Sequence, residues 1–90
     1  MPQNHLPVVE LLSKPHCHLC EEAKALLADL RLRYPFTLCE IDISTDPQLL
    51  ARYEIDIPVV FINGRKAFKY HIDPRQFARA WQRAYSRHQQ

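Results

Sequence analysis

Residues 14–24, KPHCHLCEEAK, decide the fold because they join an apolar run to an amphipathic one. The run before them, VVELL at residues 8–12, has the composition of a mostly buried strand. The apolar residues that follow recur at the three- and four-residue spacing of one helix face: Leu19, Ala23, Leu26, Leu27 and Leu30. Cys17 and Cys20 therefore lie where a strand gives way to a helix. We expect this helix to begin near Cys17 and to end before Tyr34-Pro35.

Two further segments have strand patterns. Residues 36–43, FTLCEIDI, alternate between two faces, and Cys39 shares one face with Ile41, which predicts that Cys39 packs in the core. Residues 58–64, PVVFING, are densely apolar and end in Asn-Gly, the strongest short hairpin signal. We therefore expect residues 66–70 to return as the antiparallel partner.

Two more helices are marked by aspartate followed by proline. Asp46-Pro47 and Asp73-Pro74 each offer an N-cap side chain and a residue favoured at the first helical position. The first of these helices is expected to be short. In the second, Phe77 and Trp81 mark the inner, apolar face.

The predicted order of elements is β-α-β-α-β-β-α. A right-handed crossover between the first two strands, followed by a hairpin, gives an α/β fold with a four-stranded mixed sheet and helices on both faces. A chain of 90 residues is expected to form one domain, residues 1–90, with a core from about residue 8 to residue 85 and frayed tails.

The composition limits the classes of function. The formal net charge is +2 and the basic residues are not gathered into one block, which argues against nucleic acid as a partner. No apolar run approaches the roughly 20 residues that cross a bilayer, and MPQNHLP does not resemble a secretory signal, so we expect a cytoplasmic protein without a membrane partner. Three cysteines do not suit a disulfide framework, and close cysteines in a reducing compartment indicate redox chemistry or metal.

The start of a helix favours a thiolate at Cys17. Unpaired backbone N–H groups and the positive end of the helix dipole favour the charged form of a cysteine there. Glu21 acts against this effect and Lys14 offsets Glu21, so the sequence leaves the direction of the net pKa shift of Cys17 open. Cys20, one turn later, lies on the same side, close enough for a disulfide, and is expected to be less exposed. We predict that Cys17 attacks a substrate disulfide and that Cys20 resolves the mixed disulfide.

Other interpretations of the two cysteines stay open. They could be small core residues at a helix start, or ligands of a metal or iron-sulfur cluster with His16, His18 or His71. A structural zinc site needs about four ligands, and the chain has no second pair of closely spaced cysteines. The basic residues of the predicted hairpin are expected to form a solvated edge that discourages strand pairing: Arg65, Lys66 and Lys69.

Several features together resemble the glutaredoxin-like branch of the thioredoxin fold: the strand ending in Ser13-Lys14-Pro15-His16, the Cys17-x-x-Cys20 motif, Ile57-Pro58 and the Asn63-Gly64 hairpin. The resemblance implies a cis peptide bond before Pro58, with the backbone of Ile57 presented to the substrate. It also implies that Lys14 contacts a carboxylate of glutathione. Typical glutaredoxins have a Gly-Gly pair after the hairpin, whereas residues 68–73 contain no glycine. Backbone approach to the γ-glutamyl end of glutathione would then be obstructed, and only Asp73 could replace that contact.

We therefore predict a short glutaredoxin-like thiol-disulfide oxidoreductase. Its catalytic residues would be Cys17 and Cys20, and its substrate-binding residues Lys14, Ile57 and Pro58. The substrates would be protein disulfides or glutathione mixed disulfides, with glutathione or a thioredoxin reductase as electron donor, no tightly bound cofactor or metal, and a monomeric protein. The alternative is a non-catalytic thioredoxin-fold binding module, or a metal or iron-sulfur carrier that uses the same cysteines.

Overall fold

The elements follow the predicted order in the computed structural model, which describes residues 6–88. The strands are β1 (Val8–Ser13), β2 (Thr37–Asp42), β3 (Val59–Ile62) and β4 (Arg65–Lys69). The helices are α1 (His18–Arg31), α2 (Pro47–Tyr53) and α3 (Pro74–His88), and the 3-10 turn η1 (Ile43–Thr45) precedes α2. The helix α3 extends beyond residue 85, and the rest of the predicted tails, residues 1–5 and 89–90, lie outside the described residues.

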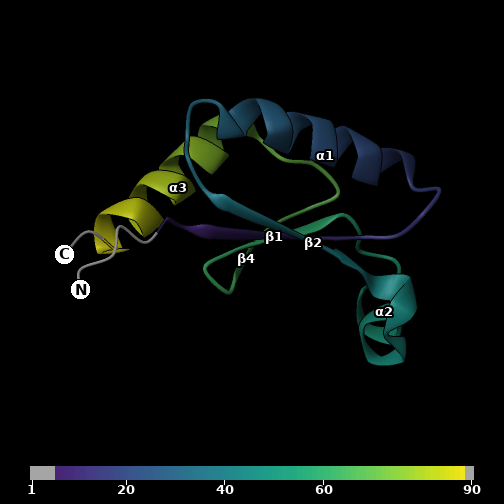
Figure 1. Cartoon of the computed structure of the whole chain (residues 1–90). Coiled ribbons are helices and arrows are strands. Elements are labelled where there is room, and N and C mark those ends of the chain that lie inside the picture. The colour runs from purple at the N-terminus through teal and green to yellow at the C-terminus, as the bar shows by residue number, and fades with distance from the viewer. Residues whose placement is uncertain (1–5, 89–90) are drawn as a thin grey trace.

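The sheet has the strand order β2-β1-β3-β4. The central strand β1 pairs in parallel with β2 and antiparallel with β3, which in turn pairs with β4. Helices α1 and α3 cover one face of the sheet and α2 lies against the other (Figure 1). The predicted α/β architecture with a mixed sheet is thus confirmed, and β2 and β4 are its edge strands.

Alternation along the strands divides the core into two clusters. Leu11 and Val60 point toward α1 and α3, where they meet Leu27, Phe77 and Trp81. The second cluster joins the opposite face of the sheet to the start of α1 and to α2, and its buried members are Leu12, Cys20, Ile43, Ile57 and Val59. The prediction that Phe77 and Trp81 are core residues is confirmed, and the second cluster brings the cysteine motif into contact with the segment before β3.

The predicted burial of Cys39 is wrong, because this cysteine is exposed. It lies on the edge strand β2 beside Glu10 of β1. The helix α2, seven residues long, packs against η1 beyond the carboxyl end of that strand, and its apolar residues share a cluster with Ile43 of η1 and with Ile41 near the end of β2. The same face of the sheet is therefore uncovered at Cys39.

The predicted caps form at both later helices. Asp46 Oδ1 accepts hydrogen bonds from the N–H groups of Gln48 and Leu49 at the start of α2. Asp73 Oδ1 accepts them from Arg75 and Gln76 at the start of α3. Within residues 6–88, no helix has the length and apolar character needed to cross a membrane.

Candidate redox site

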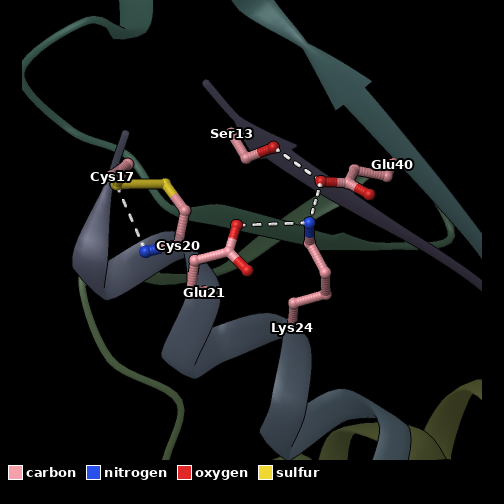
Figure 2. Close-up of a disulfide and its surroundings, with 6 residues drawn as sticks. All are labelled: Ser13, Cys17, Cys20, Glu21, Lys24 and Glu40. Carbon is pink, nitrogen blue, oxygen red and sulfur yellow. Dashed lines mark hydrogen bonds and ion pairs between the residues drawn. A yellow bond between two sulfur atoms is a disulfide. The ribbon is translucent and has the colours of Figure 1, made fainter. Parts of the chain in front are cut away.

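Cys17 and Cys20 lie at the first turn of α1, directly after the loop that leaves β1. Their Cα atoms are 5.2 Å apart and their sulfur atoms form a disulfide (Figure 2). Cys17 is the N-cap residue: its backbone is extended, and its Sγ atom accepts a hydrogen bond from the Cys20 N–H at 3.2 Å. A sulfur atom that already accepts a backbone N–H is in position to have its negative charge stabilised when the disulfide opens.

The two sulfur atoms differ in access to solvent. Cys17 is half-buried, whereas Cys20 is 1% exposed and packs with Leu12 and Val59. The expectation that Cys20 is the less exposed cysteine is thus met. The roles of attacking and resolving cysteine stay a prediction, in which the attacking cysteine must reach a large substrate and the resolving one need only reach Cys17.

The structure brings Ile57 to the cysteine motif. Ile57 is buried in the same apolar cluster as Cys20, and Cys17 packs against that cluster. The Ile57–Pro58 peptide bond is cis, as the resemblance implied, and Pro58 is fully buried. The cysteine pair and the segment before β3 are therefore neighbours in space, although they are far apart in the sequence.

Tyr70 is a further neighbour that the sequence did not single out. Its N–H donates to the Pro58 carbonyl at 2.8 Å, and its hydroxyl donates to the Ile55 carbonyl at 3.1 Å. Tyr70 also lines a cavity of about 260 Å³ between α1 and residues 70–72, which is bordered by Leu19 of the cysteine motif. Both hydrogen bonds join separate segments, so no local pattern in the sequence could have found them.

Lys14, which the resemblance assigned to a glutathione carboxylate, lies in the loop before Cys17. Its ammonium group is 3.7 Å from the Glu54 carboxylate at the carboxyl end of α2. The Lys14 side chain is 35% exposed and that of Glu54 is 54% exposed. An ion pair that is this long and this open to water is weak, so the ammonium group could exchange its partner for another carboxylate.

A second group of charges lies one turn along α1 from Cys20. The Lys24 ammonium is 3.0 Å from the Glu40 carboxylate and 3.3 Å from that of Glu21, and Glu40 accepts a hydrogen bond from the buried Ser13 hydroxyl at 3.1 Å (Figure 2). The hydrogen bonds to Glu40 and then to Glu21 raise the pKa of Lys24 above its usual value. Lys24 thus stays protonated and couples α1 to β2 beside the redox pair.

The histidines of the motif lie at its rim. His16 and His18 are exposed, and His18 Nε2 is 3.0 Å from the Glu22 carboxylate one helical turn away. Among the side chains that the structure describes, no three or more His, Cys, Asp or Glu residues lie together as ligands of one metal ion. Asp73, the other expected glutathione contact, uses its Oδ1 atom to cap α3.

A four-stranded mixed sheet with helices on both faces and a disulfide at the start of its first helix defines a thioredoxin-fold protein of redox type. The chain belongs to the family described as "Glutaredoxin-like domain (DUF836)", which it matches over residues 8–82.

A relative in Mycobacterium tuberculosis, described as an uncharacterized protein, is 31% identical over 72 residues and covers 74% of each chain. The solution structure of a protein from Nitrosomonas europaea is 26% identical, with a TM-score of 0.76 over 88% of this chain and 95% of the other. Oxidised mitochondrial thioredoxin 3 from Saccharomyces cerevisiae shares the fold at 18% identity, with a TM-score of 0.63 over 88% of this chain and 79% of that one.

Proposed function

We propose that this protein is a thiol-disulfide oxidoreductase that cycles Cys17 and Cys20 between dithiol and disulfide. The observation that carries the proposal is the difference between the two cysteines at the start of α1: Cys17 is half-buried and its Sγ atom accepts a backbone N–H, whereas Cys20 is buried. The substrates are disulfides of other proteins or mixed disulfides of glutathione. The protein acts in the cytoplasm as a monomer and needs no bound cofactor.

The reaction has two exchange steps. The Cys17 thiolate attacks one sulfur atom of the substrate disulfide, so that a Cys17–substrate disulfide forms, the substrate S–S bond breaks and one substrate thiolate leaves. Cys20 then loses its proton and attacks Cys17 Sγ, which forms the Cys17–Cys20 disulfide and releases the second substrate thiolate. The substrate gains two electrons and the protein loses two. Glutathione or a thioredoxin reductase must return them for the next cycle.

Ile57, Pro58 and Lys14 are proposed to bind the substrate. Ile57 shares an apolar cluster with both cysteines, which supports contact between its backbone and the chain that carries the substrate sulfur. The ion pair of Lys14 with Glu54 is long and exposed, so little stabilisation is lost when Lys14 binds a substrate carboxylate instead. A Lys14→Gln variant is expected to raise the KM for a glutathione mixed disulfide with little change in kcat. A Glu54→Gln variant, which frees Lys14, is expected to lower that KM.

The central experiment equilibrates the purified protein without oxygen in glutathione buffers of graded potential. Free thiols are alkylated, and each population is read by intact mass. We expect a reversible Cys17–Cys20 disulfide in the wild type, mixed disulfides that accumulate in Cys20→Ser, and no disulfide reduction by Cys17→Ser. Full activity of Cys17→Ser would exclude the mechanism.

The same samples test the alternative of a metal or cluster carrier. Metal content is measured in protein purified without chelator and without oxygen. Stoichiometric metal that is lost in both the Cys17→Ser and Cys20→Ser variants would favour a carrier, and so would thiols that stay blocked in oxidising buffer. A parallel assay with glutathione or with a thioredoxin reductase as the only reductant identifies the electron donor.

A further inference from the structure

A second cavity of about 640 Å³ lies between β4 and α3. Its volume is in the range of pockets that bind small molecules, about 300–1,000 Å³. Asn63 of the β3–β4 hairpin lines it, and its Oδ1 atom accepts a hydrogen bond from the Val8 N–H at the first residue of β1. The cysteines follow the other end of β1, and the two ends of this six-residue strand are about 20 Å apart. We call this cavity the basic groove, and it is separate from the redox site.

Four cationic side chains line the basic groove. Arg65 and Lys66 come from β4, and Arg79 and Arg83 come from α3. The lining contains no aspartate or glutamate, and α3 has neither residue anywhere along its length. Positive charge therefore faces the groove from both of its walls.

Among the described side chains, these four cations have no ion-pair partner, whereas Lys14, Lys24 and Lys69 each face a carboxylate within 4 Å. The other described arginines are unpaired as well, so the groove is set apart by the gathering of four cations around one cavity. Arg79 and Arg83 are also four residues apart on one helix, a spacing at which like charges weaken a helix. An anion bound in the groove would offset the repulsion between these positive charges.

The groove also has an apolar part. Phe68 and Ala80 are half-buried in its wall, and Phe68 is stacked on Phe77 on its core side, with ring centroids 6.4 Å apart. Guanidinium groups match phosphate oxygens with paired N–H donors, and an aromatic face accepts a flat ring. The side-chain amides of Asn63 and Gln76 add hydrogen-bonding groups at the rim.

We propose that the basic groove is a binding site for a small organic phosphate that carries a flat aromatic ring, such as a nucleotide. The phosphate lies between Arg79 and Arg83 of α3 and the basic residues of β4, and the flat ring lies against Phe68. This site neither depends on the thiol chemistry nor shares a residue with it.

The test follows backbone amide NMR signals of the reduced, full-length protein at an ionic strength of about 0.15 M. AMP and ATP are added in separate titrations, with adenosine, inorganic phosphate and a glutamate-rich peptide as comparisons. We expect saturable shifts confined to groove residues such as Phe68 and Ala80. ATP should bind more tightly than AMP, and adenosine or inorganic phosphate should bind at least about tenfold more weakly than AMP.

The double variant Arg79→Gln, Arg83→Gln should weaken ATP binding about tenfold or more, while its thermal unfolding reports that it is folded. The double variant Arg33→Gln, Arg52→Gln is the matched control, because it also removes two positive charges from exposed arginines and neither residue lines the groove. The proposal is overturned if ATP gives no saturable shifts or if this control variant weakens binding equally. It is also overturned if adenosine or inorganic phosphate binds as well as AMP, or if only the acidic peptide occupies the groove.

Discussion

The Lys24 ammonium lies 3.0 Å from the Glu40 carboxylate, and this ion pair joins α1 to the edge strand β2 one helical turn beyond Cys20. Lys24 also contacts Glu21, which is one turn beyond Cys17. A cation held between two carboxylates therefore lies one helical turn from the redox pair. Such groups act on a nearby thiolate through space, and their effects have opposite signs.

Neutralising either member of this pair is expected to shift the pKa of the Cys17 thiol in the reduced protein. Lys24→Gln removes a positive charge and should raise that pKa, whereas Glu40→Gln removes a negative charge and should lower it. Each shift should be small, because the charges are open to solvent. The rate of Cys17 alkylation against pH measures the pKa in both variants. Shifts in the same direction would contradict this electrostatic account.

The hydrogen bond that Cys17 accepts as N-cap residue is expected to contribute to the free energy of unfolding even when no disulfide is present. In a Cys20→Ser background, Cys17→Ala removes the acceptor for the first turn of α1 and should lower the free energy of unfolding by about 0.5–2 kcal/mol. Cys17→Ser keeps an acceptor and should lose much less. Urea unfolding followed by circular dichroism compares the two variants. Equal losses would mean that the cap bond contributes nothing.

Phe77 is expected to be the most sensitive core position in α3. Its ring is fully buried, and it meets Phe36 edge-on with ring centroids 5.5 Å apart. Phe77→Ala should lower the free energy of unfolding by about 3–5 kcal/mol, through lost burial and the cavity left behind. Trp81→Phe is a milder comparison, which loses the hydrogen bond from Nε1 to the Pro35 carbonyl and should cost about 0.5–1.5 kcal/mol. A smaller loss for Phe77→Ala than for Trp81→Phe would contradict this account of the core.

Gly64 is the residue of the β3–β4 hairpin that needs the left-handed backbone conformation most. Its φ is +81°, and a Cβ atom there would meet no atom within 4 Å, so any cost of substitution is conformational. Gly64→Ala should lower the free energy of unfolding by about 1–2 kcal/mol, and Gly64→Asn by less, because asparagine tolerates this region better. Thermal unfolding of both variants ranks their stabilities. A Gly64→Ala variant as stable as the wild type would refute the conclusion that this position needs the backbone freedom of glycine.

The hydrogen bonds of Asp42, at the end of β2, are expected to make the stability of the fold depend on pH. Its carboxylate accepts hydrogen bonds from the Ser44 hydroxyl and the Ser44 N–H, and these lower its pKa below the ordinary 3.8. Because the folded-state pKa is the lower one, this stabilisation is complete above pH 3.8 and is lost as pH falls through the folded-state value. Asp42→Asn should remove that part of the acid dependence, as measured by urea unfolding between neutral and acidic pH. Parallel curves for wild type and variant would show that Asp42 contributes none of it.

Most of the architecture could be read from local signals. The Asp-Pro pairs at Asp46 and Asp73 start α2 and α3, and Asn63-Gly64 turns the hairpin, as predicted. Each of these signals acts within a few residues, so it does not depend on how the sheet is assembled. The prediction for Cys39 was wrong because burial at that position depends on tertiary packing and not on a local signal. The alternation of β2 was read correctly, but which part of its face is covered depends on where the short helix α2 packs.

The features of the candidate site also fall into those predicted from local sequence signals and those set by tertiary packing. The sequence by itself determined that Cys17 begins a helix after a buried strand and that Cys20 lies one turn behind it, because apolar spacing and helix capping are local properties. Only the tertiary structure decided that Ile57 packs against the cysteine pair, that Tyr70 is bound to the Pro58 carbonyl and that Lys14 faces Glu54. These contacts join segments far apart in the chain, and they exist only once α2 and the loop before β3 have packed against the sheet.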